Sequence, residues 1–136
     1  MNMSLSSARS NVGPPVLIVD DDPLILWSFS ETLKHRGYAV VEAPDARGAL
    51  AAVAAADSPF GVVVLDLVLP DCGDLSLLSH VHTAMSDAQI IVMTAHGTWE
   101  LENAALNLGA YSVMHKPFGM AELAEMVRRA NHDRCH

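Results

Sequence analysis

The chain has 136 residues, of which 51% are hydrophobic and 5% aromatic, and its 16 acidic and 8 basic residues give a formal net charge of −8. This length corresponds to a single domain. Proteins that bind a phosphate backbone unaided carry several cations on one face, so this composition predicts no direct nucleic-acid binding. The longest apolar run, Ala49–Ala56, is far shorter than the ~20 residues of a membrane span, so we expect no membrane contact.

The cysteine content suggests a cellular compartment, and the two ends of the sequence suggest the bounds of the domain. Cys72 and Cys135, without a basic segment followed by an apolar one, argue against a secreted disulfide-bonded protein, so we expect a cytoplasmic location. Residues 1–15 are rich in Ser and Asn and lack apolar periodicity, so we predict a disordered tail or a cloning remnant there. One domain is then expected at 16–131, followed by a C-terminal tail at 132–136.

Short runs rich in Val, Ile and Leu alternate with helix-length segments from residue 16 onward. Because these runs do not alternate with polar residues, they are typical of strands that are buried on both faces of a sheet. The predicted strands are, in chain order, Val16–Asp20, Tyr38–Glu42, Val62–Asp66, Gln89–Met93 and Tyr111–Met114.

Helix signals lie between these strands: a proline in a first turn, a capping aspartate and closing glycines. The alternation of strands and helices with short connections predicts an α/β fold, a doubly wound parallel sheet of five strands with right-handed crossovers. The predicted helices that have clear signals are Leu24–Arg36, a segment after Asp45, Trp99–Leu108 and a last helix from Phe118 to about Asn131.

Aspartates follow two of the predicted strands, at the edge where a parallel sheet gathers its reactive groups. The first strand ends in three aspartates, residues 20–22, and the third strand ends in Asp66. One aspartate suffices to cap the following helix, and we assign that role to Asp22. Asp20 and Asp21 then repel each other unless a positive charge lies nearby. The turn residues after Asp66 come only at 70–74, which leaves Asp66 without a structural task.

These carboxylates predict a metal site. If the strand order is 2-1-3-4-5, the first and third strands are neighbours, and Asp66 faces Asp20 and Asp21. Three carboxylates at one small site suit a hard divalent cation that keeps several waters, which describes Mg²⁺, and Mn²⁺ could replace it. A zinc site is not indicated, because Cys72 and Cys135 lack paired spacing and the 7 histidines are scattered.

Two further polar residues follow neighbouring strands at the same edge. Thr94 follows the fourth strand and Lys116 the fifth. Either could be a common strand-end or surface residue, but a hydroxyl and an ammonium placed there can also hold the oxygens of a phosphoryl group. With a metal ion and an ionised Asp66 as nucleophile, they would support formation of an aspartyl phosphate, mostly by positioning and electrostatics.

Five short motifs follow one another along the chain. They are Val-Asp-Asp-Asp-Pro at 19–23, Leu-Asp-Leu-Val-Leu-Pro at 65–70, Met-Thr-Ala-His-Gly at 93–97, Gly-Ala at 109–110 and Lys-Pro-Phe at 116–118. In this order and spacing they are highly specific, and they resemble the motifs of the receiver domain of bacterial response regulators, the CheY-like family, over about residues 16–131. The resemblance implies a flavodoxin/CheY-like (βα)5 fold with strand order 2-1-3-4-5.

The resemblance implies a role for each acidic residue of the site. Asp66 corresponds to the phosphoacceptor of the family. Asp20 and Asp21 correspond to the acidic pair that holds Mg²⁺, together with Asp66 and the backbone carbonyl of Val68. Such domains act in two-component signal transduction and are not enzymes beyond their own phosphorylation and dephosphorylation. The phosphodonor is then a sensor histidine kinase or a phosphotransfer protein.

The resemblance also identifies residues that sense and transmit the phosphoryl group. Thr94 and Lys116 correspond to the phosphate-sensing pair, and the bond between Lys116 and Pro117 corresponds to a cis peptide bond. Val113 stands where many receivers carry an aromatic switch residue, so the usual ring rotation cannot occur. Val68, two positions after the phosphoacceptor, cannot orient a hydrolytic water, which leads to the hypothesis of slow self-dephosphorylation.

The predicted helix Trp99–Leu108 carries two apolar stripes, of which only one can pack inward unless the helix is deeply buried. If one stripe is exposed, this helix, the strand Tyr111–Met114 and the last helix form a surface for a partner or for a homodimer. The pattern alone does not decide which stripe faces outward. One stripe contains Leu101, Ala104, Ala105 and Leu108, and the other contains Trp99 and Leu106.

Three alternatives to a phosphorylated receiver are less favoured. Haloacid-dehalogenase-like hydrolases use the same aspartyl phosphate chemistry but place a second acid where this chain has Val68. A flavodoxin-like nucleotide or flavin binder would need a Gly-rich loop after the first strand, where this chain has aspartates. A degenerate receiver that acts only as a binding module would not be expected to retain all five site residues.

Overall fold

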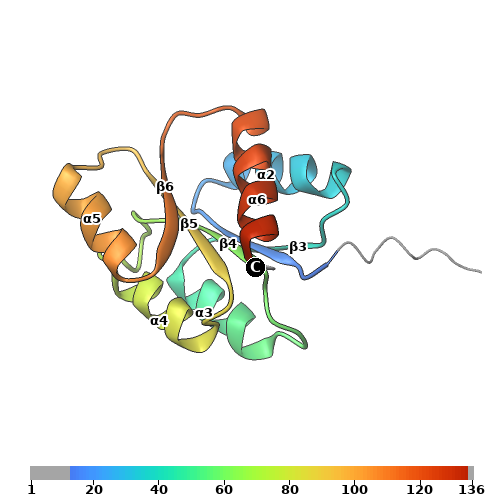
Figure 1. The fold of residues 1–136 in the computed structure, drawn as a ribbon, viewed down its shortest axis with the longest axis horizontal. Coiled ribbons are helices and arrows are strands. Elements are labelled where there is room, and N and C mark those ends of the chain that lie inside the picture. Colours follow the sequence, from blue (N-terminus) through green and yellow to red (C-terminus); the bar gives the residue numbers. More distant parts are fainter. Residues whose placement is uncertain (1–12, 135–136) are drawn as a thin grey trace, which may run out of the picture.

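The computed structural model describes residues 13–134, and within them the chain forms one five-stranded parallel sheet. The strands lie in the order β3-β2-β4-β5-β6, which is 2-1-3-4-5 in chain order and confirms the predicted topology (Figure 1). Their bounds are β2 Val16–Val19, β3 Val40–Ala43, β4 Val62–Asp66, β5 Gln89–Thr94 and β6 Ala110–His115.

Helices cover both faces of the sheet, as a doubly wound fold requires (Figure 1). Two of them, α2 and α6, pack on one face, while α3, α4 and α5 pack on the other. Within the described part of the chain, no helix is long and apolar enough to span a membrane. The helices are α2 Pro23–His35, α3 Ala46–Ala55, α4 Ser76–Ala84, α5 Trp99–Asn107 and α6 Met120–Arg134.

Alternate residues of the central strands supply the two layers of the core. In β4, Val63 and Leu65 pack in the cluster with α3 and α4, whereas Val62 and Val64 pack in the cluster with α2 and α6. All four are at most 1% exposed. Burial on both faces explains why these runs are apolar throughout, and it makes the central strands a rigid base for the residues that follow them.

The helix starts use the capping residues that the sequence indicated. The Asp22 carboxylate accepts hydrogen bonds from the amides of Leu24 and Ile25, which confirms its assignment as the N-cap of α2. Asp45 caps α3 by accepting a 2.7 Å hydrogen bond from the amide of Gly48. Because Asp22 is used in this way, Asp20 and Asp21 remain available for the site.

Several element ends differ from the prediction by one to three residues. The first strand ends at Val19, before Asp20, and β3 begins at Val40 rather than at Tyr38. The cause at β3 is that the Tyr38 amide donates to the carbonyl of Leu33 and so completes the end of α2. At the carboxyl ends of β5 and β6, each strand extends one residue further than predicted.

Both predicted tails need correction where the structure describes them. Helix α6 continues to Arg134, so residues 132–134 are helical, because buried Ala130 and a hydrogen bond from Arg134 to Asn131 stabilise its last turns. At the other end, the Pro15 carbonyl accepts a 3.0 Å hydrogen bond from the amide of Gly61. Residues 1–12 and 135–136 lie outside the described residues, so the predicted tails stay predictions there.

Candidate functional site

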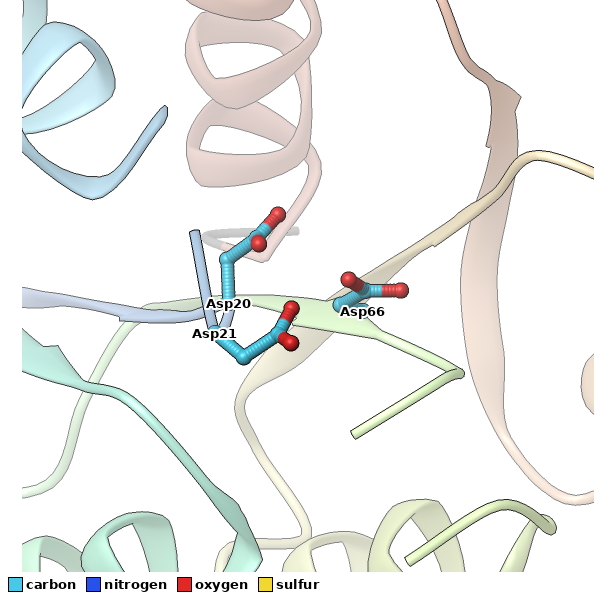
Figure 2. A group of neighbouring side chains, drawn as sticks. All are labelled: Asp20, Asp21 and Asp66. Carbon is cyan, nitrogen blue, oxygen red and sulfur yellow. The ribbon is translucent and has the colours of Figure 1, made fainter. Parts of the chain in front are cut away.

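The predicted acidic cluster is present at the carboxyl edge of the sheet (Figure 2). Strands β2 and β4 are neighbours, and Val19 pairs with Leu65, so the next residues, Asp20 and Asp66, come side by side. One carboxylate oxygen from each of Asp20, Asp21 and Asp66 lies within 4.8 Å of the others. Asp20 is fully buried and Asp66 is 6% exposed, whereas Asp21 is exposed at the mouth of the site.

Lys116 supplies the positive charge that the buried carboxylates require. Its Nζ donates to Oδ2 of Asp20 at 2.8 Å and to Oδ2 of Asp66 at 3.1 Å. The Lys116 side chain is 21% exposed, so these contacts are largely shielded from water. Its backbone amide donates to the carbonyl of Thr94 at 2.8 Å, and its bond to Pro117 is cis, as predicted.

The surroundings raise the pKa of both Asp66 and Lys116. Burial raises the pKa of the Asp66 carboxyl, and this effect outweighs the hydrogen bonds from the amide of Val68, 3.0 Å away, and from Lys116, which lower it. For Lys116, burial lowers the pKa, but the hydrogen bonds and charges of Asp20 and Asp66 together raise it above its ordinary value. Lys116 therefore stays charged at neutral pH.

The donor set fits a hard divalent cation. All the side-chain ligands are carboxylate oxygens, which Mg²⁺ and Mn²⁺ prefer. The three carboxylates outnumber the single ammonium, which contacts Asp20 and Asp66, so the cluster keeps an excess of negative charge that a cation would neutralise. The described residues thus support binding of a metal ion at this cluster.

Thr94 lies beside the acidic cluster at the end of β5. Strand β5 pairs with β4, and Asp66 is aligned with Met93, the residue before Thr94. Thr94 is 2% exposed, and its Oγ1 accepts a 3.2 Å hydrogen bond from the amide of His96. Thr94 and Lys116 thus lie at the ends of β5 and β6, at the same edge of the sheet as Asp66, and of the two it is Lys116 that contacts the Asp66 carboxylate.

The segment after Asp66 turns its side chains alternately inward and outward. Leu67 and Leu69 are each 6% exposed and pack in the core, whereas the Val68 side chain between them is 63% exposed. The amide of Leu67 donates to the carbonyl of Met93, which holds the start of this segment against β5. The outward side chain of Val68 thus lies next to Asp66 and offers no polar group to a water molecule there.

Burial distinguishes the two apolar stripes of α5, the helix that follows Thr94. Ala105 is fully buried against the core, whereas Trp99 and Leu106 are 77% and 45% exposed. The stripe that contains Ala105 therefore faces inward, except for Leu108 at its end, which is exposed. The alternative that the helix is deeply buried is wrong. Val113 of β6 is half-buried on the face that α5 covers.

Two polar contacts near the site were not predicted from the sequence. The Nε2 of His115 lies 2.7 Å from Oε2 of Glu102, which links the end of β6 to α5. In addition, the Asp71 carboxylate accepts hydrogen bonds from the amides of Ala46 and Arg47, at the start of α3. Both contacts join residues that are far apart in the chain, so no local spacing pattern could have indicated them.

The comparisons agree with this geometry. The model of the response regulator receiver domain matches residues 16–128. A CheY-like receiver domain protein from Methanospirillum hungatei has 30% sequence identity and a TM-score of 0.83, and the match covers 89% of this chain and 95% of that one. The receiver domain of NtrX from Brucella abortus has 28% identity and a TM-score of 0.76, over 86% and 98% of the two chains.

Among curated relatives, the transcriptional regulatory protein KdpE from Mycobacterium tuberculosis is 39% identical over 85% of this chain. The C4-dicarboxylate transport transcriptional regulatory protein DctD from Pseudomonas aeruginosa is 37% identical over the same share. The chain spans only 50% of the length of KdpE and 24% of the length of DctD. The matched family, the fold and the placement of the motif residues agree: the chain belongs to the response regulator receiver domain family of two-component signal transduction.

Proposed function

We propose that Asp66 accepts a phosphoryl group from a phosphohistidine of a sensor histidine kinase or phosphotransfer protein. The observation that carries this proposal is the contact of a nearly buried Asp66 with the Lys116 ammonium, inside a cluster of acidic oxygens at the sheet edge. A carboxylate placed in this way is a nucleophile that needs no general base.

The transfer uses groups that the chain already positions. One carboxylate oxygen of Asp66 attacks the phosphorus, the bond from phosphorus to the imidazole nitrogen breaks, and that nitrogen leaves with the electron pair. The amide of Val68 holds Oδ1 of Asp66 and so orients the carboxylate for attack. In the product, the Lys116 ammonium and the Thr94 hydroxyl bind the phosphoryl oxygens and stabilise the acyl phosphate.

The carboxylates of Asp20, Asp21 and Asp66 and the backbone carbonyl of Val68 would hold Mg²⁺, which Mn²⁺ could replace. When bound, the ion neutralises negative charge on the carboxylates and on the incoming phosphoryl group. Lys116 contributes a second, fixed positive charge to the same oxygens, since its Nζ already bonds to Asp20 and Asp66.

The output surface that we propose consists of α5, β6 and α6. When Thr94 binds a phosphoryl oxygen, the loop between Thr94 and α5 shifts and biases this surface between two states. Exposed Trp99 and Leu106 then contribute apolar contacts to a protein partner or to a second copy of the chain. We place the phosphoryl transfer in the cytoplasm, where the thiol of Cys72 stays reduced. We assign no direct nucleic-acid contact to this domain.

The test is phosphorylation by a small acyl phosphate with Mg²⁺, followed by intact mass measurement. We expect a labile adduct of about 80 Da, which corresponds to one phosphoryl group. The Asp66→Asn variant should not form it. Asp87→Asn is the matched control, because Asp87 is exposed just before the start of β5 and so lies at the opposite edge of the sheet.

An adduct of equal yield in Asp66→Asn would overturn the assignment of the phosphoacceptor. Steady turnover of a phosphate ester would instead favour the haloacid-dehalogenase-like alternative. The exposed apolar side chain of Val68, where that alternative requires an acid, argues against such turnover.

A further inference from the structure

The segment that carries the Val68 carbonyl forms a tight turn beyond β4. The amide of Leu69 donates to the carbonyl of Cys72 at 3.0 Å, and the amide of Cys72 donates back to the carbonyl of Leu69 at 3.3 Å. Pro70 and Asp71 form the tip of this turn. Because Leu69 is buried in the core, one end of the turn is fixed to the sheet while the tip projects outward.

The tip of the turn is hydrogen-bonded to the N-terminus of α3. The two carboxylate oxygens of Asp71 accept hydrogen bonds from the first amides of α3, at 2.8 Å from Ala46 and at 3.0 Å from Arg47. These bonds lower the pKa of Asp71, which therefore stays ionised at neutral pH. An ionised carboxylate that bonds with both oxygens to a helix N-terminus also interacts favourably with the helix dipole.

Two aspartates together cap the start of α3. The N-cap position of this helix is occupied by Asp45, whose carboxylate accepts from the amide of Gly48 at 2.7 Å. Asp71 adds bonds to the two preceding amides from a point 24 and 25 residues further along the chain. Its distinctive effect is therefore to join the turn after Asp66 to α3, which packs on the same face of the sheet as α4 and α5.

We propose that Asp71 is a positioning residue for the metal site. It anchors the turn Leu69–Cys72 to α3 and thereby holds the Val68 carbonyl, directly before the turn, in place for Mg²⁺. This inference rests on the proposed function, in which that carbonyl is a ligand. Without the anchor, the outer part of the turn would be less restrained, and the cost of ordering it when the ion binds would reduce the affinity.

The experiment compares Mg²⁺ binding by calorimetry in the wild-type protein, Asp71→Ala and Asp45→Ala. We expect Asp71→Ala to raise the Mg²⁺ dissociation constant about tenfold, as substitutions of residues that support ligands do. Asp45→Ala is the matched control, because it removes the same charge and a cap from the same helix N-terminus, but the hydrogen bond that it removes lies within α3. It should lower the melting temperature and leave the Mg²⁺ affinity within about twofold of the wild type.

A third variant separates the hydrogen bonds from the charge. Asp71→Asn removes the charge but keeps one oxygen that can accept from an amide, so its Mg²⁺ affinity should lie between those of the wild type and Asp71→Ala. It also provides the measurement if Asp71→Ala does not fold. As a second readout, raising the Mg²⁺ concentration should restore the phosphorylation rate of the Asp71 variants.

The outcomes distinguish this inference from the proposed function. If the wild-type protein binds no Mg²⁺, the proposed metal site itself is wrong. If the wild type binds but Asp71→Ala binds equally well, or Asp45→Ala loses as much affinity as Asp71→Ala, the positioning role of Asp71 is wrong. Wild-type affinity in a folded Asp71→Asn, when Asp71→Ala cannot be measured, would also overturn it.

Discussion

The ammonium of Lys116 lies 2.8 Å from Oδ2 of Asp20, a fully buried carboxylate that is 96 residues away in the sequence. This contact joins the residue that follows β2 to the residue that follows β6. A charge that is buried as deeply as that of Asp20 is tolerated only with an opposite charge beside it. The stability of the domain therefore depends on the charged residues of its site.

Substitution of Lys116 should therefore destabilise the metal-free protein. Removing one partner of a fully buried ion pair costs about 3–5 kcal/mol, and because Lys116 is 21% exposed we expect about 1–3 kcal/mol for Lys116→Met. Lys34→Met is the control, because Lys34 lies 4.0 Å from Glu31 on the surface and should change stability by less than about 1 kcal/mol. Urea unfolding in the presence of a chelator measures both values. Equal losses in the two variants would contradict the role given to Lys116.

The raised pKa of Asp66 predicts how stability depends on pH without metal. The folded protein favours the protonated carboxyl, so the stability from this group is fully present below the ordinary pKa of 3.8 and is lost as the pH rises through the raised value. In the Asp66→Asn variant, the side chain at position 66 carries no charge at any pH. This variant should be more stable than the wild type at neutral pH, and the difference should vanish in acid.

Melting temperatures across this pH range, measured with a chelator, test the prediction. Mg²⁺ should reverse the order of the two proteins at neutral pH, because the wild type keeps all its carboxylate ligands. An Asp66→Asn variant that is less stable than the wild type at neutral pH without metal would show that burial does not dominate at Asp66.

The exposed apolar side chain of Val68 predicts a long-lived phosphorylated state. Because it offers no hydrogen bond to a water molecule beside Asp66, hydrolysis should be slow, and Val68→Asn should speed phosphate release by about tenfold through positioning of that water. Release of inorganic phosphate from the purified phosphorylated protein measures both rates. Loss of the phosphoryl group from the wild type within seconds would refute this prediction.

The exposed stripe of α5 predicts a contact surface used after phosphorylation. We expect the phosphorylated protein to self-associate through this stripe. Trp99→Ser should then weaken the association at least about tenfold, as loss of an aromatic anchor does, and Leu106→Ser should act in the same direction. Trp27→Ser is the control, because Trp27 is 61% exposed on α2, which packs on the other face of the sheet. Sedimentation equilibrium of each phosphorylated variant measures the effect. Equal changes from both tryptophan substitutions would show that association does not use α5.

Much of the sheet and of the acidic cluster could be predicted from the sequence, because both depend on local patterns. The run Val62–Leu65 is apolar throughout since β4 is buried on both faces, and Asp66 follows it directly. Parallel strands end at the same edge, which brings Asp20 and Asp66 together once the strand order is known. The strand order itself came from the resemblance and not from the pattern.

The remaining features depend on contacts that no local pattern encodes. The bonds of Asp71 to α3 and of His115 to Glu102 arise from tertiary packing. The orientation of α5 is of the same kind, because Leu101 and Trp99 are both apolar and only packing against the core shows that Trp99 faces outward. The start of β3 is an exception, because the Tyr38 amide is used by a local turn with Leu33 at the end of α2.

The most direct test of the central claim is identification of the phosphorylated residue by chemical trapping. An aspartyl phosphate is reduced by borohydride to homoserine, so peptides from the phosphorylated protein can be sequenced by mass spectrometry. We predict homoserine at position 66 when Mg²⁺ and a phosphodonor are present, and unmodified Asp66 when a chelator replaces Mg²⁺. Homoserine at another aspartate, or at position 66 in equal yield without Mg²⁺, would contradict the account.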